Sequence, residues 1–366
     1  YTLRIHDTDD KTFQQFIDLP SMDKANKAMM KILFSDKNLN SSMDVGFKGN
    51  PNIGSVVLNQ IVKSVDFEDF ANSFEVDDKI FIISSIFGGT GASGFPLLKT
   101  LRTGDSFSNH DLINNAEIGA ITILPYFKLK SDDASEIDSS TFISKTKSAL
   151  AYYENNISKN GSIDALYYLA DDITNTYDNH EGGTAQENDA HLIEFLAATA
   201  IVDFSNKQHP NTVNKELGLK DIEDVVSFNS FYDTQKHLLF APLTQFILMT
   251  NCLDNKFDYF SSTAFNANNG NFEDLYDSTF MSELRNLLVK YYEWLKEMKG
   301  NKRSLDLFNL NTGDKPFELV TGVNPVKIMS MYSNYDLIIG RLNSSVKKCK
   351  SKGQKNKFLE MFYIGT

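Results

Sequence analysis

The clearest pattern of residues that could do chemistry is the glycine-rich segment 88–94, Gly-Gly-Thr-Gly-Ala-Ser-Gly, which directly follows an apolar run at 79–86. Backbone N–H groups that small residues leave accessible can point at a phosphate, and a helix that starts there adds partial positive charge. The hydroxyls of Thr90 and Ser93 could donate further hydrogen bonds to phosphate oxygens. The order of strand, glycine-rich loop and helix therefore predicts phosphate binding, with a tight structural turn as the alternative.

A dinucleotide site is another interpretation of the same loop, because segment 89–94 is similar to the G-x-G-x-x-G pattern. That fingerprint usually opens the first strand–helix unit, whereas this loop follows at least two earlier units. No acidic residue stands at a strand end about 20 residues later, where the partner of a ribose hydroxyl is expected. A nicotinamide-dependent oxidoreductase is therefore the least supported of the functional hypotheses.

Composition and charge exclude several other classes. The chain has 366 residues, 41% of them hydrophobic and 23% charged, which is typical of a globular protein with about two domains. The net charge of −12 argues against a nucleic-acid or anionic-membrane binder. No apolar run approaches the ~20 residues of a membrane span, and no signal peptide is visible, so we expect a cytoplasmic protein. Cys252 and Cys349 are far apart, which argues against a disulfide framework or a zinc site.

Short apolar runs alternate with helical patterns in the first half, which predicts an α/β fold with a parallel sheet covered by helices. We expect a helix at 21–34 with Ser21 as its N-cap, and a long, mostly apolar and buried helix at 189–204. The other strands and helices expected here are strands 1–6, 79–86, 118–124 and 163–169 and helices 53–65 and 95–101. In the second half we expect a polar loop at 206–233, helices at 238–250, 277–299 and 335–347, and an extended loop at 251–271.

Residues 81–98, FIISSIFGGTGASGFPLL, resemble the signature of the tubulin/FtsZ family, with Phe87 in place of its first glycine. Five further segments resemble family landmarks in the correct order, over residues 1 to about 205: Arg4–Asp9, Gly49–Gly54, Ile118–Phe127, Ile163–Asp172 and Asn188-Asp189. The Asn-Pro loop at 49–54 makes the resemblance greater to FtsZ than to eukaryotic tubulin.

The resemblance implies three regions. Residues 1–186 would form a Rossmann-like, parallel-sheet GTP-binding domain, 187–206 a central connecting helix, and 207–366 a smaller α+β C-terminal domain. The family's first strand, diphosphate loop and helix are not in this sequence and would precede Tyr1. We therefore expect residues 1–366 alone to bind nucleotide weakly or not at all.

The resemblance also implies a set of ligand-binding residues for GTP or GDP with Mg²⁺. The loop at 49–51 would face the terminal phosphate, Pro125 would lie beside the ribose, and Asp189 would accept hydrogen bonds from guanine that adenine cannot donate. Asp9 could orient Mg²⁺ through water, or be a plain turn residue. The complete set is Asp9, Gly49, Asn50, Pro51, Gly88, Gly89, Thr90, Gly91, Ala92, Ser93, Gly94, Pro125 and Asp189.

Subunits of the family stack head to tail, and an N-x-D-x-x-D loop of one subunit completes hydrolysis on its neighbour. The best counterpart here is segment 229–233, in which Asn229 and Asp233 would stand for the first and last residues. The middle acid is missing and the spacing is one residue short; other acids that could serve are Asp221, Glu223 and Asp224. The resemblance thus implies a divergent GTP-binding protein that self-associates head to tail and hydrolyses GTP slowly. The alternative is a non-hydrolysing scaffold or switch that acts on a partner protein through its C-terminal domain.

Overall fold

The computed structural model describes residues 8–44, 46–60, 63–94, 101–102, 107–131, 135, 137–157, 161–180, 188–206, 213–216, 225–231 and 279–307, with isolated positions between 236 and 250. The chain divides into two compact units. Unit 1 comprises Tyr1–Asn188 and Ile193–Leu217, and unit 2 comprises Asp189–Leu192 and Gly218–Thr366. The domain boundaries at 186 and 206 inferred from the resemblance stay predictions.

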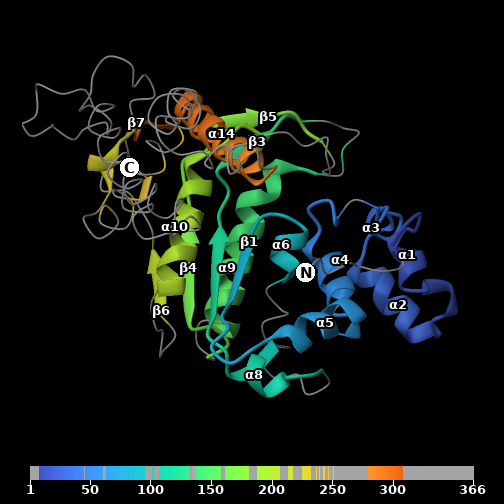
Figure 1. Cartoon of the computed structure of the whole chain (residues 1–366). Helices are drawn as coiled ribbons and strands as arrows, with labels where there is room; N and C mark the ends of the chain where they lie inside the picture. The colour runs from blue at the N-terminus through green and yellow to red at the C-terminus, as the bar shows by residue number, and fades with distance from the viewer. Residues whose placement is uncertain are drawn as a thin grey trace, which may run out of the picture. The chain divides into compact units, whose positions relative to one another are not determined.

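Unit 1 contains a four-stranded, all-parallel sheet, and its mixed α/β character agrees with the predicted fold class (Figure 1). The strands are β1 (Ile80–Ser85), β2 (Ile118–Ile123), β4 (Ala165–Leu169) and β6 (Val213–Glu216), in the order β1-β2-β4-β6. The apolar runs predicted the first three strands. The prediction of a loop throughout 206–233 was wrong, because β6, with the sequence Val-Asn-Lys-Glu, carries too little apolar character to be recognised.

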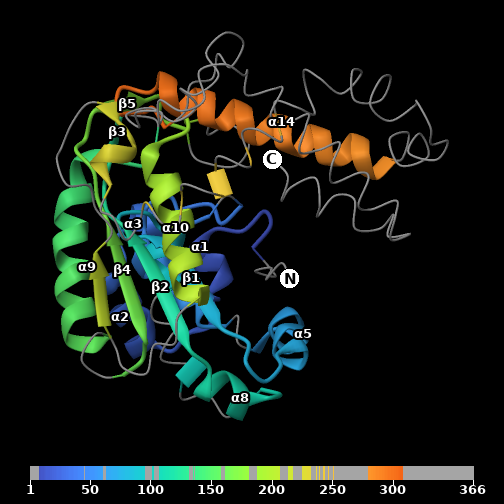
Figure 2. The same cartoon turned by 60° about the vertical axis from the view of Figure 1, so that its left-hand side comes forward.

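One face of the sheet packs against α10 (Leu192–Asn206), which begins three residues after the predicted start. The rings of Phe81 and Phe204 lie 5.2 Å apart, and the Tyr167 hydroxyl donates a 2.9 Å hydrogen bond to Asp203. Gly119 makes this contact possible, because a Cβ there would lie 2.8 Å from the rings of both phenylalanines. Figure 2 shows α10 against the β1–β2–β4 sheet and α9 on its other side.

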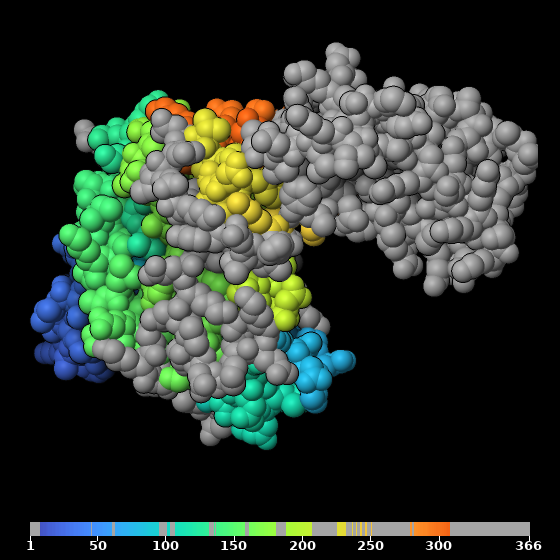
Figure 3. All heavy atoms as spheres, turned by 90° about the vertical axis from the view of Figure 1, so that its left-hand side faces the viewer, coloured from blue at the N-terminus to red at the C-terminus, as the bar shows by residue number. Residues whose placement is uncertain are grey.

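The second face packs against α4 (Pro51–Leu58), α6 (Thr90–Gly94) and α9 (Phe142–Asn156) around a large apolar core. The outer side of α9, green in Figure 3, is exposed. The single helix predicted at 53–65 is wrong, because α4 ends at Leu58 and a second helix, α5 (Val65–Ser73), begins after it. Ser64 starts this second helix, since its hydroxyl accepts a hydrogen bond from the Phe67 N–H.

The first described segment is a group of short helices: α1 (Phe13–Phe16), η1 (Leu19–Ser21), α2 (Lys24–Leu33) and α3 (Asp36–Leu39). The predicted N-cap at Ser21 is wrong. Asp23 caps α2 instead, because its carboxylate accepts hydrogen bonds from two free N–H groups of the first turn, those of Ala25 and Asn26. Ser21 ends η1, and its hydroxyl donates to Asp18.

The remaining described elements are small. Unit 1 also has α8 (His110–Asn115), η3 (Ser139–Thr141) and a parallel pair of strands, β3 (Phe127–Leu129) and β5 (Asn175–Tyr177). Unit 2 has β7 (Val225–Val226), η5 (Phe228–Ser230), α14 (Thr279–Gly300) and β8 (Ser304–Leu305). Helix α14 confirms the helix predicted at 277–299, and the described positions within 238–250 are helical. The strand predicted at 1–6, the loop at 251–271 and the helix at 335–347 lie outside the described residues.

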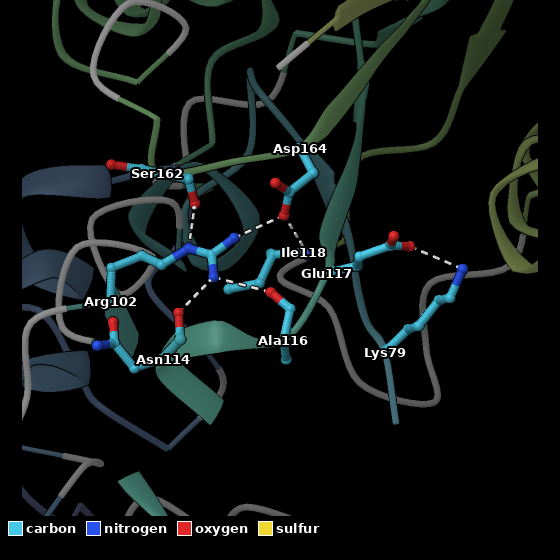
Figure 4. Close-up of polar contacts among 8 residues, drawn as sticks. All are labelled: Lys79, Arg102, Asn114, Ala116, Glu117, Ile118, Ser162 and Asp164. Atoms are coloured by element: carbon cyan, nitrogen blue, oxygen red, sulfur yellow. Dashed lines mark hydrogen bonds and ion pairs between the residues drawn. The ribbon is translucent and has the colours of Figure 1, made fainter. Parts of the chain in front are cut away.

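The amino ends of the sheet strands are held together by Arg102 (Figure 4). Its guanidinium donates to the Ser162, Asn114 and Ala116 carbonyls, at 3.1, 2.6 and 2.8 Å, and to the Asp164 carboxylate at 2.6 Å. Asp164 also accepts the N–H of Ile118, the first residue of β2, at 2.7 Å. One guanidinium therefore satisfies the end of α8 and the starts of two strands. Beside it, Lys79 and Glu117 form an ion pair of 2.7 Å.

None of the helices in the described part of the chain combines the length and the apolar character that crossing a bilayer requires.

Candidate functional site

The structure brings the two glycine-bearing loops of the sequence together at the carboxyl end of β1. A Cβ on Gly89 would lie 2.9 Å from the Gly49 nitrogen and 3.1 Å from the Asn50 nitrogen. Both neighbours are backbone atoms, so a side chain at Gly89 would force the loops apart. The predicted residues Gly49, Asn50 and Gly89 are therefore in contact, although they are far apart in the sequence.

Glycine also determines the shape of each loop. Gly46 and Gly49 have positive φ angles of 54° and 74°, a region that residues with a side chain rarely adopt. Gly91 contacts the end of β1 so closely that a Cβ there would lie 2.8 Å from the Ser85 nitrogen. Gly91 therefore lets the loop pack directly on the backbone of β1.

The second half of the predicted glycine loop is already helical. Helix α6 begins at Thr90, whereas we expected the helix to begin at Phe95. The small residues let α6 touch α4, and a Cβ on Gly54 would lie only 2.0 Å from the Ser93 hydroxyl oxygen. Ser93 is 1% exposed, and its hydroxyl donates to the Pro51 carbonyl at 2.9 Å and lies within hydrogen-bonding distance of the Gly89 carbonyl. Ser93 thus joins the two loops, and its predicted contact with phosphate stays a prediction.

Several polar groups at this junction have no partner among the described residues. Asn50 is the N-cap of α4 but its side chain makes no capping hydrogen bond, and Pro51 has no N–H. The N–H groups of Asn52 and Ile53, in the first turn, have no acceptor in the described part of the chain. The exposed hydroxyl of Thr90 is likewise without a described partner. Open donors at the start of a helix favour an anion.

A lysine that sequence analysis missed adds positive charge here. Lys145, from α9, donates a 2.9 Å hydrogen bond to the Gly49 carbonyl. Burial lowers the pKa of this ammonium, and the Asp138 carboxylate nearby opposes the shift. We did not expect a helix at 142–156, so nothing in the sequence placed Lys145 beside residue 49. Its Lys-Thr-Lys segment after a serine-rich stretch is the one local signal that could have pointed to it.

Asp9 and Pro125 lie on other segments of unit 1. Asp9 is exposed in a turn whose neighbour Asp10 donates its N–H to the Asp44 carboxylate at 2.7 Å. That contact fixes the turn beside the segment that leads into the loop at 46–50. Pro125 follows β2, the neighbour of β1, and is buried. Both stay predictions as ligand contacts.

The remaining predicted residues belong to unit 2. Asp189 is exposed, and the next residue, Ala190, donates its N–H to the Glu297 carboxylate at 2.8 Å. Asn229 is exposed within η5. Asp233 lies outside the described residues, as do the alternative acids Asp221, Glu223 and Asp224. The base-recognition and hydrolysis roles therefore stay predictions.

A search of the described residues for metal sites finds no group of three or more His, Cys, Asp or Glu side chains that could hold an ion. Comparisons with models of known protein families, with curated proteins and with solved structures give no match for this chain.

Proposed function

We propose that this chain is a divergent tubulin/FtsZ-like protein that binds GTP or GDP, with the phosphates held by the loops at 46–51 and 88–91. The observation that carries the proposal is the backbone contact of Gly89 with Gly49 and Asn50. Two loops that resemble the family's phosphate loops in sequence are neighbours in space. This juxtaposition does not follow from either motif alone.

The chemistry of the junction fits a phosphate group. Its open donors are backbone N–H groups and the Thr90 hydroxyl, and the Lys145 ammonium contacts the Gly49 carbonyl, in a chain whose net charge is −12. Glycines keep the surface low, so a phosphate oxygen can reach the backbone. Mg²⁺ would enter with the nucleotide, because this ion keeps several waters and needs few protein ligands beside the phosphates.

Self-association and hydrolysis complete the proposal and rest on the resemblance. Subunits would stack head to tail, with Asn229 and Asp233 of one subunit assisting slow hydrolysis on the next. Asp189 would select guanine over adenine. A non-hydrolysing scaffold or switch that acts through a partner protein is the alternative if the acids of this loop are too few.

The decisive test compares two glycines of the same segment in the full-length natural protein. Gly89→Ala places a methyl group against the backbone of residues 49 and 50. Gly94, although in the set predicted from the resemblance, is the last residue of α6, beyond the loop at 88–91, and has open space around it, so Gly94→Ala is the matched control. We expect Gly89→Ala to weaken binding of a fluorescent GTP analogue at least about tenfold, and Gly94→Ala to leave it unchanged. Circular dichroism of both variants checks that they fold.

Thr90→Val tests the site independently if Gly89→Ala does not fold. Thr90 is exposed and its hydroxyl has no described partner, so we expect this variant to fold. A several-fold loss of GTP-analogue affinity in Thr90→Val supports the site. Equal affinity in the wild type, Thr90→Val and Gly89→Ala would reject it. Turnover per subunit is then measured over a range of protein concentrations. Turnover that appears only above a threshold indicates an assembling GTPase, and flat or absent turnover with intact binding indicates the switch.

A further inference from the structure

A pocket of about 690 Å³ opens between α4, α6 and α9. Its lining includes residues 50–52 at the start of α4 and extends along α9 as far as Tyr153. The lining combines hydroxyl and amide groups with apolar side chains. The pocket, called here the α4–α9 pocket, is lined by Asn50, Pro51, Asn52, Ser55, Ile86, Ala92, Ser144, Lys145, Ser148, Ala149, Tyr152 and Tyr153.

The charge in the lining of the α4–α9 pocket is positive. Lys145 is the one ionised group among the described lining residues, and no carboxylate faces it there. Desolvation lowers the pKa of Lys145, as expected for an ammonium that has lost part of its water. The Asp138 carboxylate, which is outside the lining, only partly opposes this shift, so an anion in the pocket would add to the attraction on this cation.

The uncharged lining indicates the rest of the ligand. Ser55, Ser144 and Ser148 project from two facing helices, and Asn52 adds an amide on the α4 side. Tyr152, 48% exposed, offers an aromatic face at the far end. Hydroxyl and amide groups that surround a single cation suit a compact, hydroxylated molecule with one anionic group. A purely apolar ligand would leave these groups without hydrogen bonds.

Lys145 connects this pocket to the phosphate loops. The same ammonium that lines the pocket donates to the Gly49 carbonyl at 2.9 Å. A second negative charge near Lys145 would neutralise the cation that attracts a phosphate at the loops, and would repel that phosphate directly. Binding at the pocket and binding at the loops are therefore opposed, and the opposition must be reciprocal.

We propose that the α4–α9 pocket is a second ligand site, which binds a small hydroxylated molecule carrying one phosphate or carboxylate group, and that its occupancy weakens nucleotide binding at the neighbouring loops. The first half stands on the pocket alone. The second half rests on the proposed nucleotide binding.

The first half is tested by isothermal titration calorimetry with glucose 6-phosphate as the probe, and with glucose and inorganic phosphate as partial ligands. Ser148→Leu places a larger side chain in the pocket from an exposed position on α9 that is outside both loops. The control, Ala151→Leu, introduces the same leucine at an exposed position of α9 outside the lining. We expect the probe to bind more tightly than either fragment, Ser148→Leu to weaken it at least about tenfold, and Ala151→Leu to leave it unchanged.

The second half is tested by measuring the affinity of the fluorescent GTP analogue with and without saturating probe. We expect the probe to weaken the analogue about fivefold in the wild type and not at all in Ser148→Leu. Probe binding that survives Ser148→Leu, or no probe binding at all, would overturn the site while leaving GTP binding intact. Absent GTP binding with intact probe binding would instead reject the proposed function and the coupling, and retain the pocket.

Discussion

The two ends of the parallel sheet in unit 1 differ in how their polar groups are hydrogen-bonded. At the amino end, Arg102 and Asp164 form an ion pair. Arg102 also donates hydrogen bonds to three backbone carbonyls, and Asp164 accepts one from the Ile118 N–H. At the carboxyl end, small residues bring loop backbones together and leave donors such as the Asn52 N–H open. The polar groups described at the amino ends of these strands are therefore hydrogen-bonded, whereas some backbone donors at the carboxyl ends are open.

This difference indicates that the amino end of the sheet contributes to stability and the carboxyl end to ligand binding. Arg102 and Asp164 are 15% and 23% exposed, so their charges are strongly coupled and costly to separate. A donor left open at the surface costs little in the free protein, because water satisfies it, and it becomes useful when an anion replaces that water. Substitutions at the amino end should change stability alone, and substitutions at the carboxyl end should change binding.

The largest effect is expected at the amino end. Arg102→Met keeps much of the side-chain length but removes the cation beside Asp164 and the guanidinium donors to three backbone carbonyls. Removing one partner of a pair this buried should lower the free energy of unfolding by roughly 3–5 kcal/mol. Urea denaturation followed by circular dichroism measures the loss.

The control for that change is Lys147→Met, at an exposed position of α9. It should alter the free energy of unfolding by less than about 0.5 kcal/mol. GTP-analogue affinity, measured where both variants are folded, should equal that of the wild type. A loss of affinity in Arg102→Met as large as its loss of stability would mean that the two ends are not independent.

A smaller effect is expected from Lys145 at the carboxyl end. Lys145→Met should weaken nucleotide binding about tenfold, by removing the cation that contacts the Gly49 carbonyl, while the protein stays folded. Because burial lowers its pKa, Lys145 should lose its charge at a lower pH than an ordinary lysine of pKa 10.5. Affinity in the wild type should therefore begin to fall while exposed lysines are still charged.

Lys145→Arg separates this titration from other effects of high pH, because a guanidinium stays protonated throughout that range. We expect its affinity to stay constant where that of the wild type falls. Identical pH profiles for the two proteins, measured by titration of the fluorescent analogue, would remove Lys145 from the site.

The smallest effect is expected from the outer ion pair of the amino end. Glu117 and Lys79 are 27% and 28% exposed, so water screens much of their attraction. Glu117→Gln should lower the free energy of unfolding by less than about 1 kcal/mol, and added salt should reduce the difference further. A loss comparable to that of Arg102→Met would show that burial does not rank these two pairs.

Much of the fold could be predicted because it depends on local pattern. The runs at β1, β2 and β4 are apolar enough to require burial on both faces, and α14 has a clear amphipathic pattern. Helix α9 was not predicted, because serine, lysine and tyrosine dilute its apolar positions. Strand β6 pairs with β4 through backbone hydrogen bonds, which its sequence does not predict.

The candidate site shows the same limit more strongly. Both loops were recognised from their glycines, and the structure brings Gly49 and Gly89 together. The position of Lys145 depends on how α9 packs, which no local pattern specifies. Ser93 was assigned to a phosphate from its type, but its burial and its hydrogen bond to Pro51 follow from the contact of two helices. Residue type indicated the chemistry, and packing selected the atoms available for it.

The position of the single tryptophan has a practical consequence. Trp294 lies on α14, in unit 2, and its ring meets that of Tyr291 edge to face at 6.2 Å. Tryptophan emission under selective excitation is therefore an intrinsic optical reporter of unit 2 alone. The far-ultraviolet circular dichroism signal sums the helices and strands of both units, α14 among them, so a tryptophan melting curve that differs from it would show that unit 2 does not unfold together with the rest of the chain. No dye or inserted fluorophore is needed to learn whether the two units melt together.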